Sequence, residues 1–284
     1  SPFGAGALAG SSIQLDPEKS GDALGFNGAM ANSIDAVSDR DFAAEALFIL
    51  AMLGVHLSRI GEEFILWSST EFNWVAIDDA YATGSSIMPQ KKNADVAELA
   101  RGKSGRFIGN LTSLLVVLKA MPFAYNRDLQ EDKEPVFDSV DQLLILLPAL
   151  TGMVATAKFN KAQISKTAAA GFSLATEIAD FLAKKQIPFS KAHEVAGECV
   201  KFCEKSGIEL HEITDDQLLK IHPALTKDLR ALLNLEGAIS SRTSAMATSK
   251  KSVSQAVAQL NKEITKVDAE ISKHQKRLSG MIRP

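Results

Sequence analysis

The chain has 284 residues, which is long enough to bury a substantial core in one large domain or in two smaller ones. Its 46% apolar and 23% charged residues are ordinary for a globular protein. The net charge of −3 provides no electrostatic footprint for nucleic acid or for an anionic membrane, so neither is an expected partner.

The two cysteines, Cys199 and Cys203, are too few for a disulfide framework, and the first residues lack the basic and apolar segments of a secretory signal. A reducing cytoplasm is therefore the expected location. The longest uncharged run, residues 142–157, is short for a membrane span and is interrupted by Pro148, so it predicts a buried helix. Together with His211, the two cysteines fall short of a structural zinc set, and we expect no metal.

In chain order, residues 1–12 are rich in glycine, alanine and serine and predict a loop, and three long helices are predicted after it. The first, Arg40–Ser69, is apolar on nearly every side, which is typical of a helix inside a large bundle or an oligomer core. The second, Ala94–Lys119, has acidic residues in its first turn and a lysine at its end, an order that complements the helix dipole. The third is Pro135–Lys158, with proline at a favourable first position.

Shorter helices are predicted beyond residue 159. They are Leu174–Lys185, Ser190–Lys205, Asp215–Ile221 and Thr226–Leu235. The polar segment 240–251 predicts a mobile loop. Because strand signals are few, the predicted fold class is all-α. We expect two domains, a long-helix central bundle at residues 1–157 and a smaller α-helical C-terminal domain at residues 158–284.

The last predicted helix has apolar residues that alternate spacings of four and three, as in a coiled coil. These residues are Val253, Val257, Leu260, Ile264, Val267 and Ile271. Ser252 and Gln255 fit a capping box at the start of this helix. Two interpretations stay open: the helix packs on its own domain, or it binds a partner helix.

Residues 84–93, a loop before the second long helix, are the most informative segment of the chain. Abstracting a proton next to a carboxylate gives a dianionic aci-carboxylate, which requires a positioned base and preorganised positive potential. Ser85 is a candidate base if its alkoxide is stabilised by the backbone N–H groups of the turn at Gly84–Ser86, by Lys91 and by the N-terminus of the following helix. Lys91 and Asn93 are then candidate ligands for the carboxylate, under a loop able to close over the substrate.

The plain alternative for this segment is a turn with solvated lysines. The whole of residues 84–93, however, resembles the signature loop of the fumarase/aspartase superfamily, whose members eliminate fumarate from substituted succinates. A phosphate-binding loop ending at Gly102-Lys103-Ser104 is excluded, because Ala97 stands where that motif requires glycine and the segment lies in mid-helix.

Further segments narrow the resemblance to the argininosuccinate lyase family. They are residues 1–10, 32–36, 38–42, 125–134, 188–189 and 192–194. The resemblance covers nearly the whole chain and weakens only after about residue 240. It implies a fumarase/aspartase-like bundle, a homotetramer whose active sites combine residues from several copies, and no cofactor.

By position, the resemblance makes Ser85 the catalytic serine of a mobile loop and gives Lys91 and Asn93 the carboxylate side of the substrate. It puts Glu98 where the family keeps a carboxylate near its catalytic histidine. Ala94 departs from the proline that is usual in the family, and this change could loosen the exit of the loop without altering the chemistry.

The resemblance also makes Tyr125, Gln130 and Lys133 contacts of the arginine-like half of the substrate. A phenol, an amide and an ammonium suit the amino-acid end of arginine. The plain alternative for residues 125–134 is a charged connection between two helices.

Two catalytic elements of the family, a Thr-His pair and a Ser-Arg-Asn segment, have no counterpart here, since no histidine of the chain follows a threonine. The histidines are His56, His193, His211, His222 and His274, and we expect mainly structural or surface roles for them. The chain is therefore expected to be the C-terminal part of the enzyme, inactive without the missing N-terminal portion.

The implied function is that of an argininosuccinate lyase, a carbon–nitrogen lyase of arginine biosynthesis that splits argininosuccinate into L-arginine and fumarate. One alternative is another fumarate-releasing lyase of the adenylosuccinate type, and residues 125–134 argue against it. The other alternative is a catalytically silent helical scaffold, like the crystallins recruited from this family. Which group acts as acid and which as base stays open.

Overall fold

The computed structural model describes residues 1–281, in which helices predominate, so the all-α prediction is confirmed. The α-helices of this part are α1 Pro17–Leu24, α2 Ser33–Ser38, α3 Asp41–Ser68, α4 Asp95–Leu118, α5 Lys133–Thr156, α6 Lys161–Ala168, α7 Ala175–Lys184, α8 Phe189–Ser206, α9 Asp215–Ile221, α10 Leu235–Ser240 and α11 Lys250–Met281. The 3-10 helices are η1 Asp79–Tyr81, η2 Arg127–Asp132, η3 Leu210–Glu212 and η4 Lys227–Ala231.

Strands occur only as two short antiparallel pairs in the described residues. β1 (Val75–Ala76) pairs with β4 (Lys158–Phe159), and β2 (Thr83–Gly84) pairs with β3 (Lys92–Asn93). The chain divides into two compact units, one ending at Asn160 and one beginning at the next residue. The assignment of functional domains at residues 1–157 and 158–284 stays a prediction.

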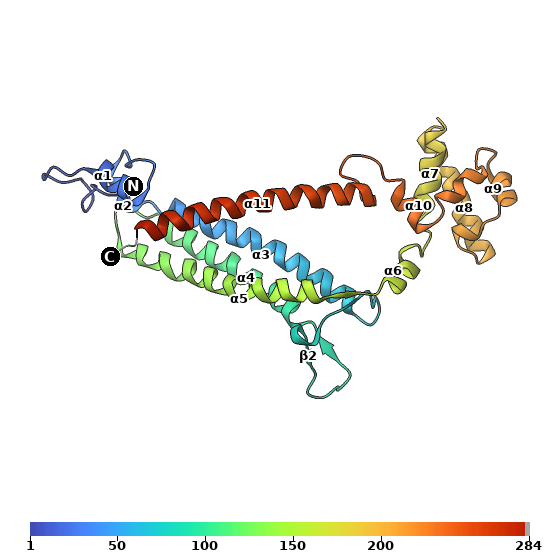
Figure 1. Ribbon diagram of the computed structural model, residues 1–284, viewed down its shortest axis with the longest axis horizontal. Coiled ribbons are helices and arrows are strands. Elements are labelled where there is room, and N and C mark those ends of the chain that lie inside the picture. The colour runs from blue at the N-terminus through green and yellow to red at the C-terminus, as the bar shows by residue number, and fades with distance from the viewer. Residues whose placement is uncertain (282–284) are drawn as a thin grey trace. The chain divides into compact units, whose positions relative to one another are not determined.

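The first unit is built on α3, α4 and α5, which lie side by side as long helices (Figure 1). Glycines bring α3 close to α4. A Cβ atom on Gly61 would lie 2.5 Å from the Ala97 carbonyl oxygen, and one on Gly54 would lie 2.5 Å from the Phe107 ring. The backbone of α4 fills the space that a side chain at Gly61 would need, and the Phe107 ring fills the space at Gly54. Close packing of the two helices therefore requires glycine at both positions.

The same three helices leave many large apolar side chains exposed. They are Phe42, Phe48, Ile49, Met52, Ile60 and Leu66 on α3, Leu99, Ile108, Leu115 and Val116 on α4, and Phe137, Val140, Leu144, Ile145 and Val154 on α5. Two stretches, Asp41–Ser68 and Arg127–Thr156, are apolar and long enough to cross a membrane by length and composition, a test that core helices of soluble proteins also pass. A surface of this extent is typical of a contact with another molecule.

The second unit closes its own core among α7, α8, α9, α10 and the short helices between them. Its fully buried side chains include Ile178, Leu182, Cys199, Cys203, Leu210, Ile213, Leu218, Leu225 and Leu229. Arg242 completes the packing at the end of α10 by pairing with Glu177 and, at 2.9 Å, with Asp180 of α7.

Two local predictions in the second unit are wrong. The expected helix Thr226–Leu235 is the 3-10 helix η4 followed by a separate helix, α10. Asn234 explains the break, because its side-chain oxygen accepts the N–H of Gly237 at 2.8 Å and so caps a new helix. The expected capping box at Ser252 lies inside α11, where the Ser252 N–H instead donates to the hydroxyl of Ser249 at 3.3 Å.

The apolar seam of α11 is open to solvent. Its six residues, from Val253 to Ile271, are each between 48% and 56% exposed. The interpretation that this helix packs on its own domain is therefore wrong for the part of the chain that the structure describes. Binding to a partner helix stays a prediction.

Candidate active site

The loop 84–93 forms the tip of a small hairpin that directly precedes α4 (Figure 1). Across the tip, the Ser85 N–H donates to the Lys91 carbonyl at 3.3 Å, and the Lys91 N–H donates to the Met88 carbonyl at 3.0 Å. At its base, the Thr83 hydroxyl bonds to the Asp95 carboxylate in the first turn of α4. The hairpin is thus anchored at its base and reaches into solvent at its tip.

The Ser85 hydroxyl oxygen accepts two backbone hydrogen bonds, from the N–H of Ile87 at 3.2 Å and from the N–H of Met88 at 3.1 Å. These donors do not come from the turn at Gly84–Ser86, as was expected. They come from Ile87 and Met88, two and three residues after Ser85. Two N–H groups aimed at one oxygen stabilise negative charge on it. The tip of the hairpin therefore places two N–H donors on the Ser85 oxygen.

The other predicted residues of this end lie close in the chain but differ in exposure. Lys91 is exposed at the tip and has no ion-pair partner among residues 1–281, whereas Asn93 is half-buried in β3. Glu98 is exposed in the first turn of α4. Since Ala94 provides no side-chain cap, the first N–H groups of α4 are open at this end of the helix.

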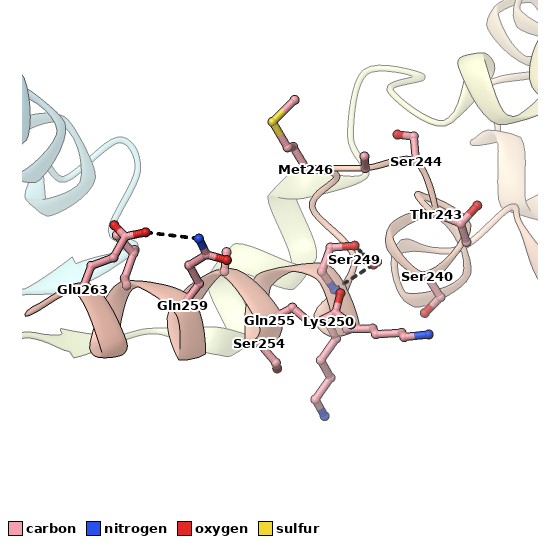
Figure 2. A pocket seen from close by; sticks show the side chains of 15 residues that line it. Ser240, Thr243, Ser244, Met246, Ser249, Lys250, Ser254, Gln255, Gln259 and Glu263 are labelled. Atoms are coloured by element: carbon pink, nitrogen blue, oxygen red, sulfur yellow. Dashed lines mark hydrogen bonds between the residues drawn. The ribbon is translucent and has the colours of Figure 1, made fainter. Parts of the chain in front are cut away.

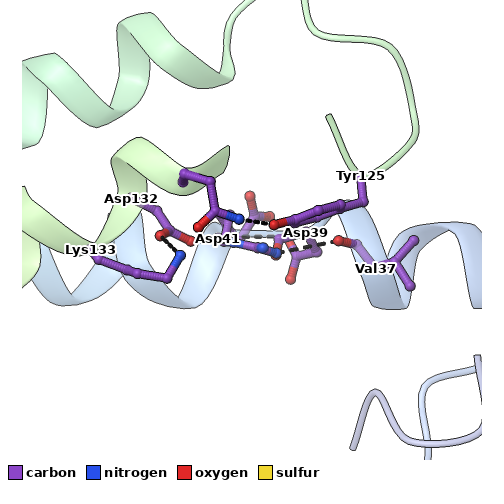
Figure 3. Close-up of polar contacts among 8 residues, drawn as sticks. Val37, Asp39, Asp41, Tyr125, Asp132 and Lys133 are labelled. Carbon is purple, nitrogen blue, oxygen red and sulfur yellow. Dashed lines mark hydrogen bonds and ion pairs between the residues drawn. The ribbon is translucent and has the colours of Figure 1, made fainter. Parts of the chain in front are cut away.

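A second cluster surrounds η2. The Gln130 amide donates to the Tyr125 hydroxyl, and the Lys133 ammonium donates to an Asp132 carboxylate oxygen at 2.8 Å (Figure 3). Arg40, at the start of α3, donates from Nε to the other Asp132 oxygen at 2.5 Å. Burial, the largest single effect, raises the pKa of Asp132, but its hydrogen bonds to Lys133 and Arg40 outweigh this and hold the pKa below its ordinary value.

This cluster opens into a cavity of about 1110 Å³ in the first unit. Tyr125 and Lys133 line it, whereas Gln130 supports it through Tyr125. The remaining wall is mostly apolar and includes Phe26, Met30, Val37, Phe42, Val136 and Phe137. A few polar groups in an apolar wall are typical of a small-molecule site.

The two clusters lie at different levels of the bundle. Arg106 and Asn110 of α4 both bond to Asp138, which lies near the start of α5, so η2 lies beside the C-terminal part of α4. The helical rise between Asp95 and Asn110 is about 22 Å at 1.5 Å per residue. The structure therefore brings Ser85, Lys91, Asn93 and Glu98 to one end of α4 and Tyr125, Gln130 and Lys133 to the other.

A cavity of about 940 Å³ in the second unit is lined by the loop before α11 and by the first turns of that helix (Figure 2). Its polar groups are mainly serine hydroxyls and the side chains of Lys250 and Lys251. Ser249, the buried member of the set, already bonds to Ser252. None of the predicted site residues lines this cavity.

The second unit offers no reactive thiol. Burial raises the pKa of the Cys199 thiol to about 12 and also raises the pKa of Cys203. Both side chains are fully buried core residues, and His211 lies in η3. Among residues 1–281 no three potential ligands gather as a metal site would require.

Arg40 and Asp132 belong to the η2 cluster but were not predicted as site residues. Both lie inside segments that carry the family resemblance, 38–42 and 125–134, but they are far apart in the chain. A contact between residues so distant in sequence leaves no local pattern. The only available signal was an aspartate next to the predicted substrate contact Lys133.

Two families match parts of this chain. The family described as Lyase matches residues 1–109, and the family described as Argininosuccinate lyase C-terminal matches residues 172–240. An argininosuccinate lyase of Streptomyces griseus is 58% identical over 93% of this chain and 56% of the relative. One of Saccharopolyspora erythraea is 55% identical over 99% of this chain and 57% of the relative. The chain thus spans about half the length of the curated relatives it matches.

Solved structures resemble the described fold. EDDS lyase in complex with formate is 30% identical, with a TM-score of 0.89 over 99% of this chain and 57% of that one. An EDDS lyase variant with bound fumarate is 29% identical, with the same TM-score and coverage. A 3-carboxy-cis,cis-muconate lactonizing enzyme from Pseudomonas putida, 20% identical with a TM-score of 0.58 over 70% of this chain and 45% of that one, shares the fold alone.

Proposed function

This chain belongs to the argininosuccinate lyase family, and we propose that it supplies two of the residue clusters of an argininosuccinate lyase active site. The reaction is the β-elimination of argininosuccinate to L-arginine and fumarate. The observation that carries the proposal is the Ser85 hydroxyl, whose oxygen receives two backbone N–H groups in a loop that also holds Lys91 and Asn93.

In the proposed reaction, Ser85 removes a proton from the succinyl carbon next to a carboxylate, and the electron pair left behind is held as an aci-carboxylate. Lys91 and Asn93 bind the oxygens on which this charge develops. The pair then forms the carbon–carbon double bond of fumarate as the carbon–nitrogen bond breaks, and an acid group of the N-terminal portion gives a proton to the guanidino nitrogen. A related solved structure with bound fumarate supports this assignment of the product.

The η2 cluster is the proposed site for the arginine half of the substrate. Lys133 offers an ammonium to a carboxylate, and Tyr125 and Gln130 offer a hydroxyl and an amide beside it. The apolar wall of the cavity suits the methylene chain of arginine. We assign Glu98 to orienting a histidine that the described chain does not supply.

We further propose a homotetramer in which the hairpin of one copy meets the η2 cluster of another. The separation of about 22 Å along α4 supports this, because one substrate molecule cannot reach both clusters of one chain. The exposed apolar surface of α3, α4 and α5 supports it as well. Gly102, Gly105 and Gly109 of α4 face open space, which permits close approach of another helix.

The remaining catalytic groups are proposed to come from a portion equivalent to the N-terminal part of the relatives. Cytoplasmic location is part of the same proposal, since Cys199 and Cys203 are free thiols. No cofactor is needed for the proposed chemistry.

The proposal is tested by joining the N-terminal part of the Streptomyces griseus relative to this chain and following fumarate absorbance after adding argininosuccinate. We expect turnover, and we expect Ser85→Ala to lower kcat by about 10²–10⁴-fold, the contribution of a positioned base. Ser86→Ala, which changes the neighbouring exposed serine, is the matched control and keeps its rate. No turnover from a correctly assembled tetramer, or release of fumarate from adenylosuccinate instead, would overturn the assignment.

Composite sites have a test of their own. Ser85→Ala and Lys133→Met are each expected to be inactive alone, but chains of the two kinds, denatured and refolded together, restore about a quarter of the sites by random mixing. The first variant supplies an intact η2 cluster and the second an intact hairpin. Absence of recovery from mixed tetramers would mean that both clusters come from the same chain.

A further inference from the structure

We propose that Arg40 is a positioning residue that acts through Asp132 to orient the Lys133 ammonium toward the substrate cavity. The proposal rests on the proposed function, since it takes Lys133 as a substrate contact. Figure 3 shows Lys133 beside Asp132, and Arg40, at the start of α3, donates to the same carboxylate.

Asp132 is shared between two cations. One carboxylate oxygen accepts from Arg40 Nε at 2.5 Å, and the other accepts from Lys133 Nζ at 2.8 Å. The side chains of Arg40 and Asp132 are 15% and 11% exposed, whereas that of Lys133 is 51% exposed. Arg40 and Asp132 therefore form a buried ion pair with a fixed position, and Lys133 extends from this pair to the surface of the cavity.

Asp132 is the residue at which η2 passes directly into α5, and its backbone has right-handed helical angles. Its side chain makes no capping hydrogen bond to the first turn of α5. Both of its oxygens are directed at Arg40 and Lys133 instead. The side chain is therefore available for the interaction with the lysine beside the cavity.

Arg40 is itself held firmly. Its Nη1 donates to the Asp39 carbonyl at 2.6 Å and to the Val37 carbonyl at 3.4 Å, near the end of α2. Arg40 thus links the end of α2, the start of α3 and the start of α5. All three elements contribute residues to the wall of the cavity, including Val37 and Val136.

The physical role follows from the sharing of charge. Burial of the Asp132 carboxylate costs free energy unless the carboxylate accepts hydrogen bonds from charged donors. With Arg40 bound to one oxygen, Lys133 donates one N–H to the other and keeps its remaining N–H groups for a ligand. Without Arg40, Asp132 would draw the lysine fully onto itself and away from the cavity.

The test uses the assembled protein carrying the N-terminal portion, with argininosuccinate turnover and calorimetric binding of L-arginine as separate readouts. Arg40→Gln is expected to raise KM and to weaken arginine binding about tenfold, with kcat changed less than about threefold, as for loss of uniform binding. Arg40→Lys retains the charge without the guanidinium geometry and is expected to recover part of this loss.

A double-mutant cycle separates positioning from general stability. Lys133→Met is expected to abolish most of the effect of Arg40→Gln, so that the double variant binds arginine no worse than Lys133→Met alone. Arg106→Gln, which breaks the Arg106–Asp138 pair elsewhere between α4 and α5, is the control and leaves KM unchanged. Additive losses in the cycle, or a fall in thermal stability without a change in KM and arginine affinity, would overturn the proposal.

The two readouts also keep this proposal distinct from the proposed function. If the assembled protein does not turn over argininosuccinate, the proposed function fails, and the arginine-binding cycle still decides the role of Arg40. Arginine binding that is insensitive to Lys133→Met and to Arg40→Gln alike contradicts the role of Arg40 even where turnover is normal.

Discussion

The long helices α3, α4 and α5 of the first unit and the helices α7 to α10 of the second unit bury their apolar residues in opposite ways. In the second unit, residues such as Ile178, Leu182 and Leu218 are fully buried within the unit itself. In the first unit, three long helices pack only along their shared seam, and residues such as Phe137 and Leu144 are 63% and 66% exposed.

The difference separates a region that buries its apolar side chains by itself from one that leaves them exposed. A closed core supports folding without a partner, whereas exposed leucines and phenylalanines on long helices require one. The proposed catalytic residues and substrate contacts all lie in the first unit, on the long helices with the open surface or on the segments that connect them. Assembly and catalysis are therefore expected to be coupled there and not in the closed core of α7 to α10.

The largest expected effect comes from placing a charge on the open surface. Leu144→Asp on α5 would bury an unpaired carboxylate at every copy of the proposed interface, which costs several kcal/mol per copy. We expect loss of the tetramer by light scattering and loss of fumarate release together. Leu219→Asp on α9, at a residue that is 48% exposed in the second unit, is expected to retain both. A tetramer that survives Leu144→Asp would show that this surface is not the interface.

The next effect tests whether the core formed by α7 to α10 excludes solvent. Leu182→Ala removes a fully buried side chain and is expected to destabilise that unit by about 2–5 kcal/mol. Labelling of Cys199 and Cys203 at pH 8 during urea denaturation measures it, because both thiols react only when the unit opens. Leu219→Ala, at an exposed position, should change the labelling midpoint little. Rapid labelling of the native protein would contradict a closed core.

The smallest effect is acid sensitivity of the first unit. The hydrogen bond from Arg106 lowers the pKa of Asp138 against a smaller opposing effect of burial. Because the folded pKa is depressed, the pair contributes stability at neutral pH, and this is lost as the pH falls below about 4 and through the folded pKa. We expect Asp138→Asn to remove up to about 1 kcal/mol of stability at pH 7 and to flatten the acid limb of the denaturation curve.

The second unit supplies the comparison for this pH dependence. The exposed Lys191 lowers the pKa of Glu194 through a hydrogen bond within α8. Since water and salt screen this pair, Glu194→Gln is expected to leave the acid limb unchanged. An equal effect of both substitutions would contradict the distinction between the two pairs.

Much of the fold followed from patterns within single helices. The apolar run after Arg40 and the charge order of Ala94–Lys119 predicted α3 and α4 to within about two residues, as the 3.6-residue period and the helix dipole are local properties. The errors near Thr226–Leu235 and Ser252 arose because several side chains in each segment could cap a helix N-terminus, and the sequence does not show which one does. The short helices α1, α2 and α6 were not predicted at all, because six to eight residues carry little periodic signal.

Part of the candidate site could likewise be predicted from the sequence, and part of it could not. The hairpin residues Ser85, Lys91 and Asn93 were found together because they are together in the chain. The hydrogen bonds of Ile87 and Met88 to Ser85 were not foreseen, since they depend on how the tip of the hairpin turns.

The helical fold class, the resemblance to the argininosuccinate lyase family and the candidate residues could all be predicted from the sequence alone. Which of these residues lie close together in space depends on how the helices pack. The antiparallel course of α3, α4 and α5 brings Arg40 to Asp132, a contact across 92 positions. The same course holds the hairpin about 22 Å along α4 from the η2 cluster. The types and spacing of side chains are properties of each segment of the sequence, whereas contacts between distant segments form only when the helices pack together.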